Sequence, residues 1–280
     1  MKKQQSLILR LSLVTISTFL VLFIMFNAIT STIILSESRQ LGEKNVTLAN
    51  EITATKISER FSETIAVLEQ DQQLLLTMIE RGQLTSDFLI DFKTNVLQND
   101  PSILGYAVII KADALNHTNP QHMQYIDQKG FFAPYIVNTN NTISIERLAD
   151  ATDGIWYSES AKTKKLTITE PYEFTIKGQA TPMMTISVPL IKNGDMIGVT
   201  VVDMPLNFLQ NIVEQNIPDT AIQPVASPEG SIIIDSGSSD NVNQSLEPFV
   251  PNWSEVLTAM QSGTNIDFYA DSVTFGEKSY

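Results

Sequence analysis

The 280-residue chain contains no cysteine and only two histidines. The absence of cysteine excludes disulfides and thiolate metal sites, so any region outside the cytoplasm has to be held together by packing alone. His117 and His122 are separated by Pro120 and have no neighbouring ligands, which makes them a poor metal site. We therefore expect neither a metal nor a cofactor.

Charged residues are absent from the segment 11–35, LSLVTISTFLVLFIMFNAITSTIIL. Because about 20 apolar residues suffice to cross a bilayer, this segment predicts a membrane-spanning helix. A cleaved signal peptide is the alternative, but its apolar region is usually about 7–15 residues long, and no clean cleavage pattern follows here. Three cations precede the segment, and the positive-inside rule then places residues 1–10 in the cytoplasm and residues 36–280 outside the cell membrane.

Positive charge is scarce beyond this segment. Three of the 18 lysines and arginines precede it, and the remaining 15 stand against all 31 aspartates and glutamates, which gives residues 36–280 a formal charge of −16. An acidic surface repels the phosphates of nucleic acids and favours cationic ligands. We therefore expect no nucleic-acid partner.

Apolar residues make up 43% of the chain, enough to build a core. Between positions 57 and 79 they recur at spacings of three, four and seven, with polar residues such as Asp71 between them. This period predicts an amphipathic helix over about 38–80, ended by Gly82 and roughly 65 Å long. A helix of this length either pairs with a second copy in a homodimer or packs along its own domain.

A second, shorter helix is predicted for TSDFLIDFKTNVLQND, capped by Thr85 or Ser86. From position 101 onward, apolar runs separated by turns such as NTNN and KNGD indicate strands, with a short helix at 156–162. We expect an antiparallel meander against which the long helix packs, and hence an α+β fold. The predicted strands cover residues 103–110, 131–138, 142–147, 166–175, 182–191 and 196–204.

The stretch WYSESAKTKKLTITEPYEFTIKGQATPMMTISVPLIKNGDMIGVTVVDMPLNFLQNIV follows one span and one long helix. In this order of parts it resembles the membrane-distal module of the double Cache, or PDC-like, sensor domains of bacterial chemoreceptors and sensor kinases. The resemblance runs from about residue 36 to the end. It implies stalk and second helices over 36–100, a membrane-distal module over 101–210 and a membrane-proximal module over 211–280.

The stretch IQPVASPEGSIIIDSGSS is similar to the first hairpin of the membrane-proximal module of that family. The chain ends before a second span, so this module is expected to be incomplete. The resemblance favours a methyl-accepting chemotaxis protein as the full receptor. A histidine kinase or a cyclic-dinucleotide enzyme would carry the same exterior.

The amino-acid-binding branch of this family implies a ligand site. There a Trp-Tyr pair, a later Tyr and an Asp on a following strand enclose the ligand, and the matching residues here are Trp156, Tyr157, Tyr172 and Asp203. A carboxylate binds an ammonium group through a charge-assisted hydrogen bond, and aromatic faces add about 0.5–2 kcal/mol each by cation–π attraction. The alternative for the aromatic residues is an ordinary place in the core.

The same branch has an arginine two residues before the Trp, where this chain has Gly154. Glycine cannot clamp a carboxylate, so we expect a small amine or quaternary ammonium as ligand. Asp153 is either a second acceptor or the N-cap of the short helix. Arg147 would restore an amino acid as ligand if it replaced the missing clamp, and it is otherwise a charged surface residue on a strand.

The sequence Asp-Ser-Gly at Asp235 resembles the motif of aspartic proteases. That chemistry needs two carboxylates that share one proton, and the chain has no second such motif. A turn in a hairpin of the second sheet explains Asp235 more simply. For the domain as a whole, a structural or adhesive role without a ligand pocket is a further alternative. We expect a ligand-binding receptor and not an enzyme.

Overall fold

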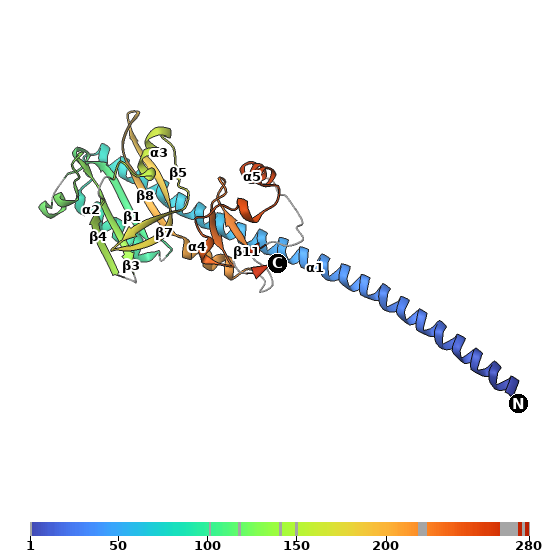
Figure 1. Ribbon diagram of the computed structural model, residues 1–280. Helices are drawn as coiled ribbons and strands as arrows, with labels where there is room; N and C mark the ends of the chain where they lie inside the picture. Colours follow the sequence, from blue (N-terminus) through green and yellow to red (C-terminus); the bar gives the residue numbers. More distant parts are fainter. Residues whose placement is uncertain are drawn as a thin grey trace. The chain divides into compact units, whose positions relative to one another are not determined.

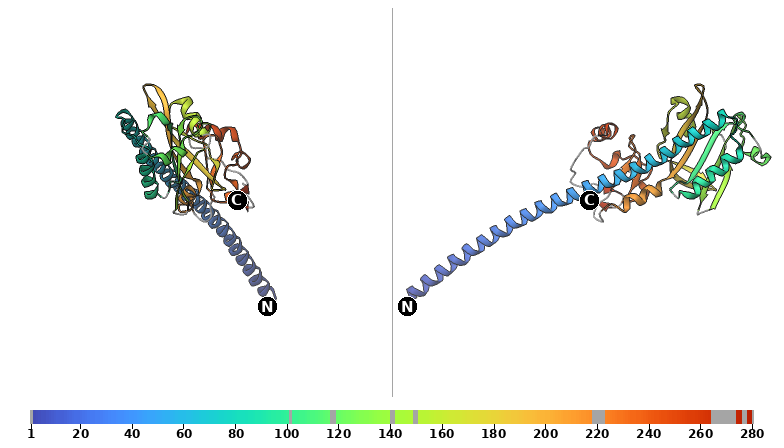
Figure 2. Two further views of the ribbon diagram at one scale, coloured as in Figure 1. Left: turned by 90° about the vertical axis from the view of Figure 1, so that its left-hand side faces the viewer. Right: turned by 180° about the vertical axis from the view of Figure 1, so that it is seen from behind.

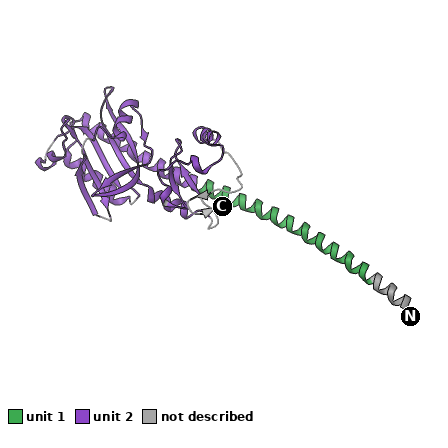
Figure 3. Ribbon diagram, in the orientation of Figure 1, with its two compact units in different colours: residues 1–52 green, residues 53–280 purple. Residues whose placement is uncertain are grey.

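The computed structural model describes residues 2–100, 102–116, 119–139, 142–148, 151–217, 223–263, 274–275 and 278–279. His117 lies outside these residues. The chain divides into two compact units, Met1–Ile52 and Thr53–Tyr280 (Figure 3).

Helix α1 (Lys2–Glu80) is continuous and contains both the apolar segment and the amphipathic helix (Figure 1). The predicted start of a separate helix near residue 38 is therefore wrong. No proline interrupts the sequence there, and the pair Arg39–Glu43, with 3.3 Å between Nε and Oε1, has the spacing that supports a helix. The helix is long and apolar enough to cross a membrane. It ends before Gly82, whose φ of 63° is left-handed.

The second unit is built on an antiparallel sheet with the strand order β4-β3-β1-β8-β7-β5, in which β2 pairs with β1 and β6 pairs with β7. The strands are β1 (Gly105–Lys111), β2 (Phe131–Phe132), β3 (Pro134–Thr139), β4 (Thr142–Arg147), β5 (Thr167–Ile168), β6 (Tyr172–Ile176), β7 (Gln179–Lys192) and β8 (Asp195–Pro205). The fold is α+β, as predicted.

The predicted meander is wrong at one point of the topology. The last strand, β8, returns to pair with the first, from Gly105↔Asp203 to Ile110↔Gly198, which leaves β4 at an edge. Both strands are buried on both faces, and such continuous apolar runs do not specify their partners. Two predicted strands are also divided, the first at Ala133 and the second before Tyr172, where Pro171 has no N–H for a ladder.

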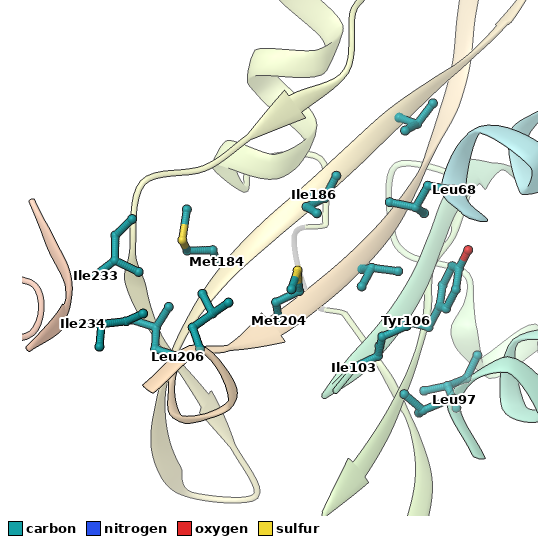
Figure 4. Packing of buried hydrophobic residues seen from close by; sticks show 14 of the residues in the cluster. Leu68, Leu97, Ile103, Tyr106, Met184, Ile186, Met204, Leu206, Ile233 and Ile234 are labelled. Carbon is teal, nitrogen blue, oxygen red and sulfur yellow. The ribbon is translucent and has the colours of Figure 1, made fainter. Parts of the chain in front are cut away.

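Successive side chains of the central strands face two different layers. On one face lie α1 and α2 (Ser86–Asn99) (Figure 2). Tyr106 of β1 packs there with Leu68 of α1 and Leu97 of α2 (Figure 4), and Val202 of β8 belongs to the same cluster. The N-cap of α2 is Thr85, whose side chain accepts the N–H of Phe88, as predicted.

The opposite face of the sheet is covered by α3 (Ile155–Thr163). Ala107 of β1 and Val201 of β8 pack there with Trp156 of α3 and Phe174 of β6. The sheet therefore separates the layer that contains α1 from the layer that contains the predicted ligand-binding residues.

A buried ion pair joins the two helices to the sheet. Asp71 of α1 and Lys93 of α2 are almost fully buried and form a salt bridge. The same carboxylate oxygen accepts hydrogen bonds from the Tyr106 hydroxyl at 3.0 Å and from the Thr200 hydroxyl at 2.6 Å. Burial lowers the pKa of Lys93 to about 8, and the charge of Asp71 opposes this shift. The sequence had placed Asp71 on the polar face of the long helix, and that prediction is wrong.

After β8 the chain forms smaller elements. Helix α4 (Leu206–Glu214) precedes the hairpin of β9 (Pro224–Ala226) and β10 (Ile232–Asp235), which lies where a hairpin was predicted. Ile233 and Ile234 of β10 belong to the same apolar cluster as Leu206 and Met204 (Figure 4). The remaining elements are η1 (Ala112–Ala114), η2 (Pro120–Tyr125), η3 (Ser239–Asn241), η4 (Glu247–Phe249), α5 (Trp253–Ser262), β11 (Thr274–Phe275) and β12 (Lys278–Ser279).

Candidate functional site

A small cavity lies on the α3 face of the sheet. Three of the five predicted residues, Trp156, Tyr172 and Asp203, line it together. The free space inside is only about 10 Å³, roughly the room that one water molecule needs. A larger ligand therefore requires a side chain to move. The full lining is Ala107, Tyr135, Leu148, Trp156, Tyr172, Phe174, Val201 and Asp203.

The pairing of the strands places Asp203 in the middle of this lining. It lies directly between Gly105 of β1 and Thr185 of β7 in the sheet register. The Thr185 hydroxyl donates to Asp203 Oδ1 at 2.6 Å, and the Tyr172 hydroxyl lies 2.6 Å from the Thr185 oxygen. Because Thr185 has a single O–H and gives it to the carboxylate, Tyr172 is the donor to Thr185.

The carboxylate of Asp203 is buried. Burial raises its pKa to about 6, and the hydroxyls of Thr185 and Tyr135 oppose the shift. Among the residues that the structure describes, no cation forms an ion pair with Asp203. Burial and the nearby Asp203 also raise the pKa of Tyr172 and of Tyr135, so both phenols stay protonated. The cavity is therefore electrostatically suited to a positively charged group.

Aromatic rings form much of the remaining lining of the cavity. The indole of Trp156 stacks on Tyr172 with ring centroids 5.8 Å apart, and Phe174 meets the indole edge-on at 5.9 Å. The indole Nε1–H is buried and has no hydrogen-bond partner among the described residues. Such faces attract cations, and the unpaired N–H is a donor available to a ligand.

Gly154 allows the indole to take this position. Its backbone, with φ −65° and ψ 149°, is open to any residue, so the reason for glycine is space and not conformation. A Cβ at Gly154 would lie 2.2 Å from two carbons of the Trp156 ring. The indole thus occupies the space that a side chain at position 154 would need.

We expect Gly154→Ala to expel the indole from the cavity, because a 2.2 Å contact cannot be accommodated without movement of the ring. The emission of Trp156 should shift to longer wavelength as the ring becomes solvated. Trp253→Phe removes the second tryptophan and serves as the background for the measurement. An unchanged emission maximum would show that the ring does not pack over Gly154.

Tyr157 and Asp153 lie outside the lining of the cavity. Tyr157 packs edge-on against Phe131, with ring centroids 5.7 Å apart, and burial raises its pKa. Asp153 has a side chain that is 63% exposed and forms a salt bridge of 2.5 Å with Lys129. It does not cap α3, since the N-cap is Gly154 and makes no side-chain cap bond. A role of these two residues in binding stays a prediction.

Arg147 is exposed at the end of β4, where it pairs with Pro134, and it is not part of the lining. Two polar residues of the site were missed by the sequence analysis. Thr185 bonds to Asp203 and Tyr135 lines the cavity. Both reach the site through strand register, which leaves no local signal in the sequence.

Asp235 is fully buried at the end of β10. Its Oδ1 accepts the N–H of Gly237 at 2.7 Å and its Oδ2 accepts the Asn241 side-chain amide at 2.6 Å. These bonds fix the turn after β10. A more open cleft of about 390 Å³ adjoins Asp235 and α4.

His122 contacts Ser86 and Asn119, with Nδ1 3.2 Å from the serine hydroxyl. Within the described residues there is no group of three or more His, Asp or Glu side chains that could hold a metal ion.

Residues 90–211 match the sequence model of the methyl-accepting chemotaxis protein-like first PDC sensor domain. No curated protein matches the chain significantly. Among solved structures, the extracellular domain of the candidate histidine kinase mmHK1S-Z3 is 21% identical, with 81% of each chain covered and a TM-score of 0.63. The periplasmic sensory domain of the Campylobacter jejuni chemoreceptor Tlp1 is 17% identical, with 76% of this chain and 79% of that one covered and a TM-score of 0.62.

The sensory domain of the C. jejuni chemoreceptor Tlp3 with isoleucine bound is 18% identical, with 84% of each chain covered and a TM-score of 0.51. At these identities the structures show a shared fold. Residues 90–211 are therefore similar in sequence to a first PDC sensor domain, and the chain shares the fold of the extracellular sensor domains of chemoreceptors and histidine kinases.

Proposed function

We propose that this chain senses a small amine or quaternary ammonium outside the cell, in the cavity between α3, β6 and β8. The observation that supports this most is the buried carboxylate of Asp203, which faces aromatic rings and has no cationic partner among the described residues. A buried charge without a partner is costly, and a bound cation would supply the missing interaction.

An amino acid is the alternative ligand, because the related Tlp3 domain binds isoleucine. An amino acid would bring a carboxylate into the cavity, and that group needs a cation or several donors. The eight lining residues include no lysine or arginine, and Arg147 is not among them. The indole N–H of Trp156 is a single neutral donor. The lining therefore favours a cation without a carboxylate.

Strand β8 connects the cavity with α1. Asp203 faces the cavity, while Thr200 of the same strand faces the other way and donates to Asp71 of α1. We propose that occupancy of the cavity shifts β8 relative to α1, and that α1 carries the shift toward the bilayer as part of a homodimer. A ligand drives such a shift only if it binds one arrangement more tightly than the other.

In the proposed receptor, residues 11–35 span the membrane and residues 36–280 lie outside the cytoplasm. Residues 101–210 and 211–280 would then be the membrane-distal and membrane-proximal modules. The output would be chemotaxis, with kinase or cyclic-dinucleotide signalling as alternatives. Calorimetric titration of the chain in lipid nanodiscs with tert-butylammonium and with isoleucine tests the proposal. We expect saturable 1:1 binding of the amine only, whereas binding of isoleucine alone would overturn it.

The affinity for the amine should depend on pH. Because the pKa of Asp203 is raised to about 6, the carboxylate is ionised above this value and protonated below it. A cation then competes with one proton, so its affinity should be about tenfold lower at pH 5 than at pH 8. Tert-butylammonium keeps its charge over this range. An affinity that does not change with pH would show that Asp203 does not contact the ligand. Asp203→Asn is the control, because its affinity should not depend on pH in this range.

A further inference from the structure

Tyr135 contributes a second phenol to the cavity beside Tyr172. Tyr135 is only 3% exposed and lines the cavity, and its hydroxyl makes no well-formed hydrogen bond to the described residues, although it lies close enough to Asp203 to oppose the rise in the pKa of that carboxyl. Buried polar groups in folded proteins are nearly always paired, and an exception needs an explanation. The hydroxyl of Tyr172, the other phenol of the lining, already donates a hydrogen bond to Thr185.

The sheet places this hydroxyl next to Asp203. Tyr135 of β3 pairs with Ala107 of β1, and Gly105, two residues earlier on β1, pairs with Asp203 of β8. A Cβ at Gly105 would lie 2.4 Å from the Tyr135 hydroxyl oxygen. The phenol therefore leans over Gly105 and fills the space beside the carboxylate. Asp203 contributes to the raised pKa of Tyr135, after burial, which is consistent with this proximity.

We propose that Tyr135 determines specificity in this site by accepting one N–H of an ammonium ligand whose other N–H groups point to Asp203. The inference rests on the proposed function and narrows its ligand class. The site would select primary and secondary ammonium ions over quaternary ones.

The chemistry follows from the donors that each ligand brings. A primary ammonium has three N–H groups, and the Asp203 carboxylate keeps acceptor sites after it has bonded to Thr185. One ammonium can therefore bridge the carboxylate and the Tyr135 oxygen. A quaternary ammonium has no N–H and would leave the Tyr135 hydroxyl buried and unpaired. The faces of Trp156 and Tyr172 attract both kinds of cation, so they do not discriminate between them.

Two cations of the same shape separate the contribution of hydrogen bonds from that of cation–π attraction. Tert-butylammonium and tetramethylammonium each have five heavy atoms in the same tetrahedral arrangement, and only the first carries N–H groups. Calorimetric titration of the 280-residue chain in lipid nanodiscs at pH 8 should give at least about tenfold tighter binding of tert-butylammonium, because only this cation donates hydrogen bonds to Asp203 and to Tyr135. In Tyr135→Phe this ratio should fall by about threefold or more, because the bond to Tyr135 is lost while those to Asp203 remain. Tyr125→Phe, whose ring packs against Phe132 away from the cavity, should keep the wild-type ratio.

Equal binding of the two cations, or a ratio that Tyr135→Phe leaves unchanged, would overturn the inference while the proposed function stands. Binding of neither cation would overturn the proposed function itself. Thermal unfolding of Tyr135→Phe tests whether the variant changes the ratio by disturbing the fold. Because the hydroxyl makes no well-formed hydrogen bond to the described residues, its removal should not lower the midpoint of unfolding. A lowered midpoint would mean that the hydroxyl holds the fold together, which contradicts its assignment to the ligand.

Discussion

Replacement of Asp203 by asparagine is expected to weaken the binding of tert-butylammonium by at least about 100-fold, or about 2.7 kcal/mol. Asparagine keeps the size of the side chain and an oxygen that accepts the Thr185 hydroxyl, so the change removes the charge and little else. Truncation of one member of a buried charge pair has effects of this size. Calorimetric titration at pH 8 measures the loss.

The same substitution should stabilise the protein in the absence of a cation. The pKa of Asp203 is about 6 when folded, above its ordinary value of 3.8, so the folded chain binds more protons between these values and loses stability as pH rises through them. At pH 8 the cost is up to about 3 kcal/mol, and asparagine removes it. Asp195→Asn, at the exposed start of β8, is the matched control and should change neither affinity nor stability. Wild-type affinity in Asp203→Asn would contradict the proposed role of the carboxylate.

Lys93→Met should destabilise the fold by about 3–5 kcal/mol, because it leaves the charge of Asp71 buried without its partner. Two neutral donors, Tyr106 and Thr200, would remain on the same carboxylate oxygen. They cannot replace the lost charge. Urea unfolding of the wild type and the variant measures the difference.

The double variant Asp71→Leu with Lys93→Met tests whether the single variant loses stability through the unpaired charge of Asp71 or through poorer packing. Apolar replacement of a whole buried pair is often neutral, so most of the stability should return. Lys162→Met is the surface control, since its salt bridge to Glu159 is exposed and it should change stability by less than about 0.5 kcal/mol. If Lys93→Met were as stable as the wild type, Lys93 and Asp71 would not be paired in the core.

The elements of the fold could be predicted because each has a local pattern. The apolar period of α1, the Thr85 cap of α2 and the turn residues around β4 act within a few positions of the chain. The pairing of β1 with β8 could not be predicted in this way. Both strands are buried on both faces, so neither shows which neighbour it takes.

The candidate site could also be predicted only in part. Trp156, Tyr172 and Asp203 were proposed from a family resemblance, and the structure brings them to one cavity. Tyr135 lies on β3 and Asp203 on β8, and β1 pairs with both strands. The Tyr135 ring reaches the cavity because β1 has a glycine, Gly105, where the ring passes over it. Asp71 looked like a surface residue because its partner Lys93 belongs to a different helix. A single-sequence pattern contains no information on such contacts between elements.

A crystal structure of the chain grown with tert-butylammonium at pH 8 tests most directly whether this cavity binds cations. We expect the ammonium nitrogen about 2.7–2.9 Å from an oxygen of Asp203, with the indole of Trp156 moved away from Gly154 to make room. An indole still folded over Gly154, with the ammonium absent or bound elsewhere, would contradict the account.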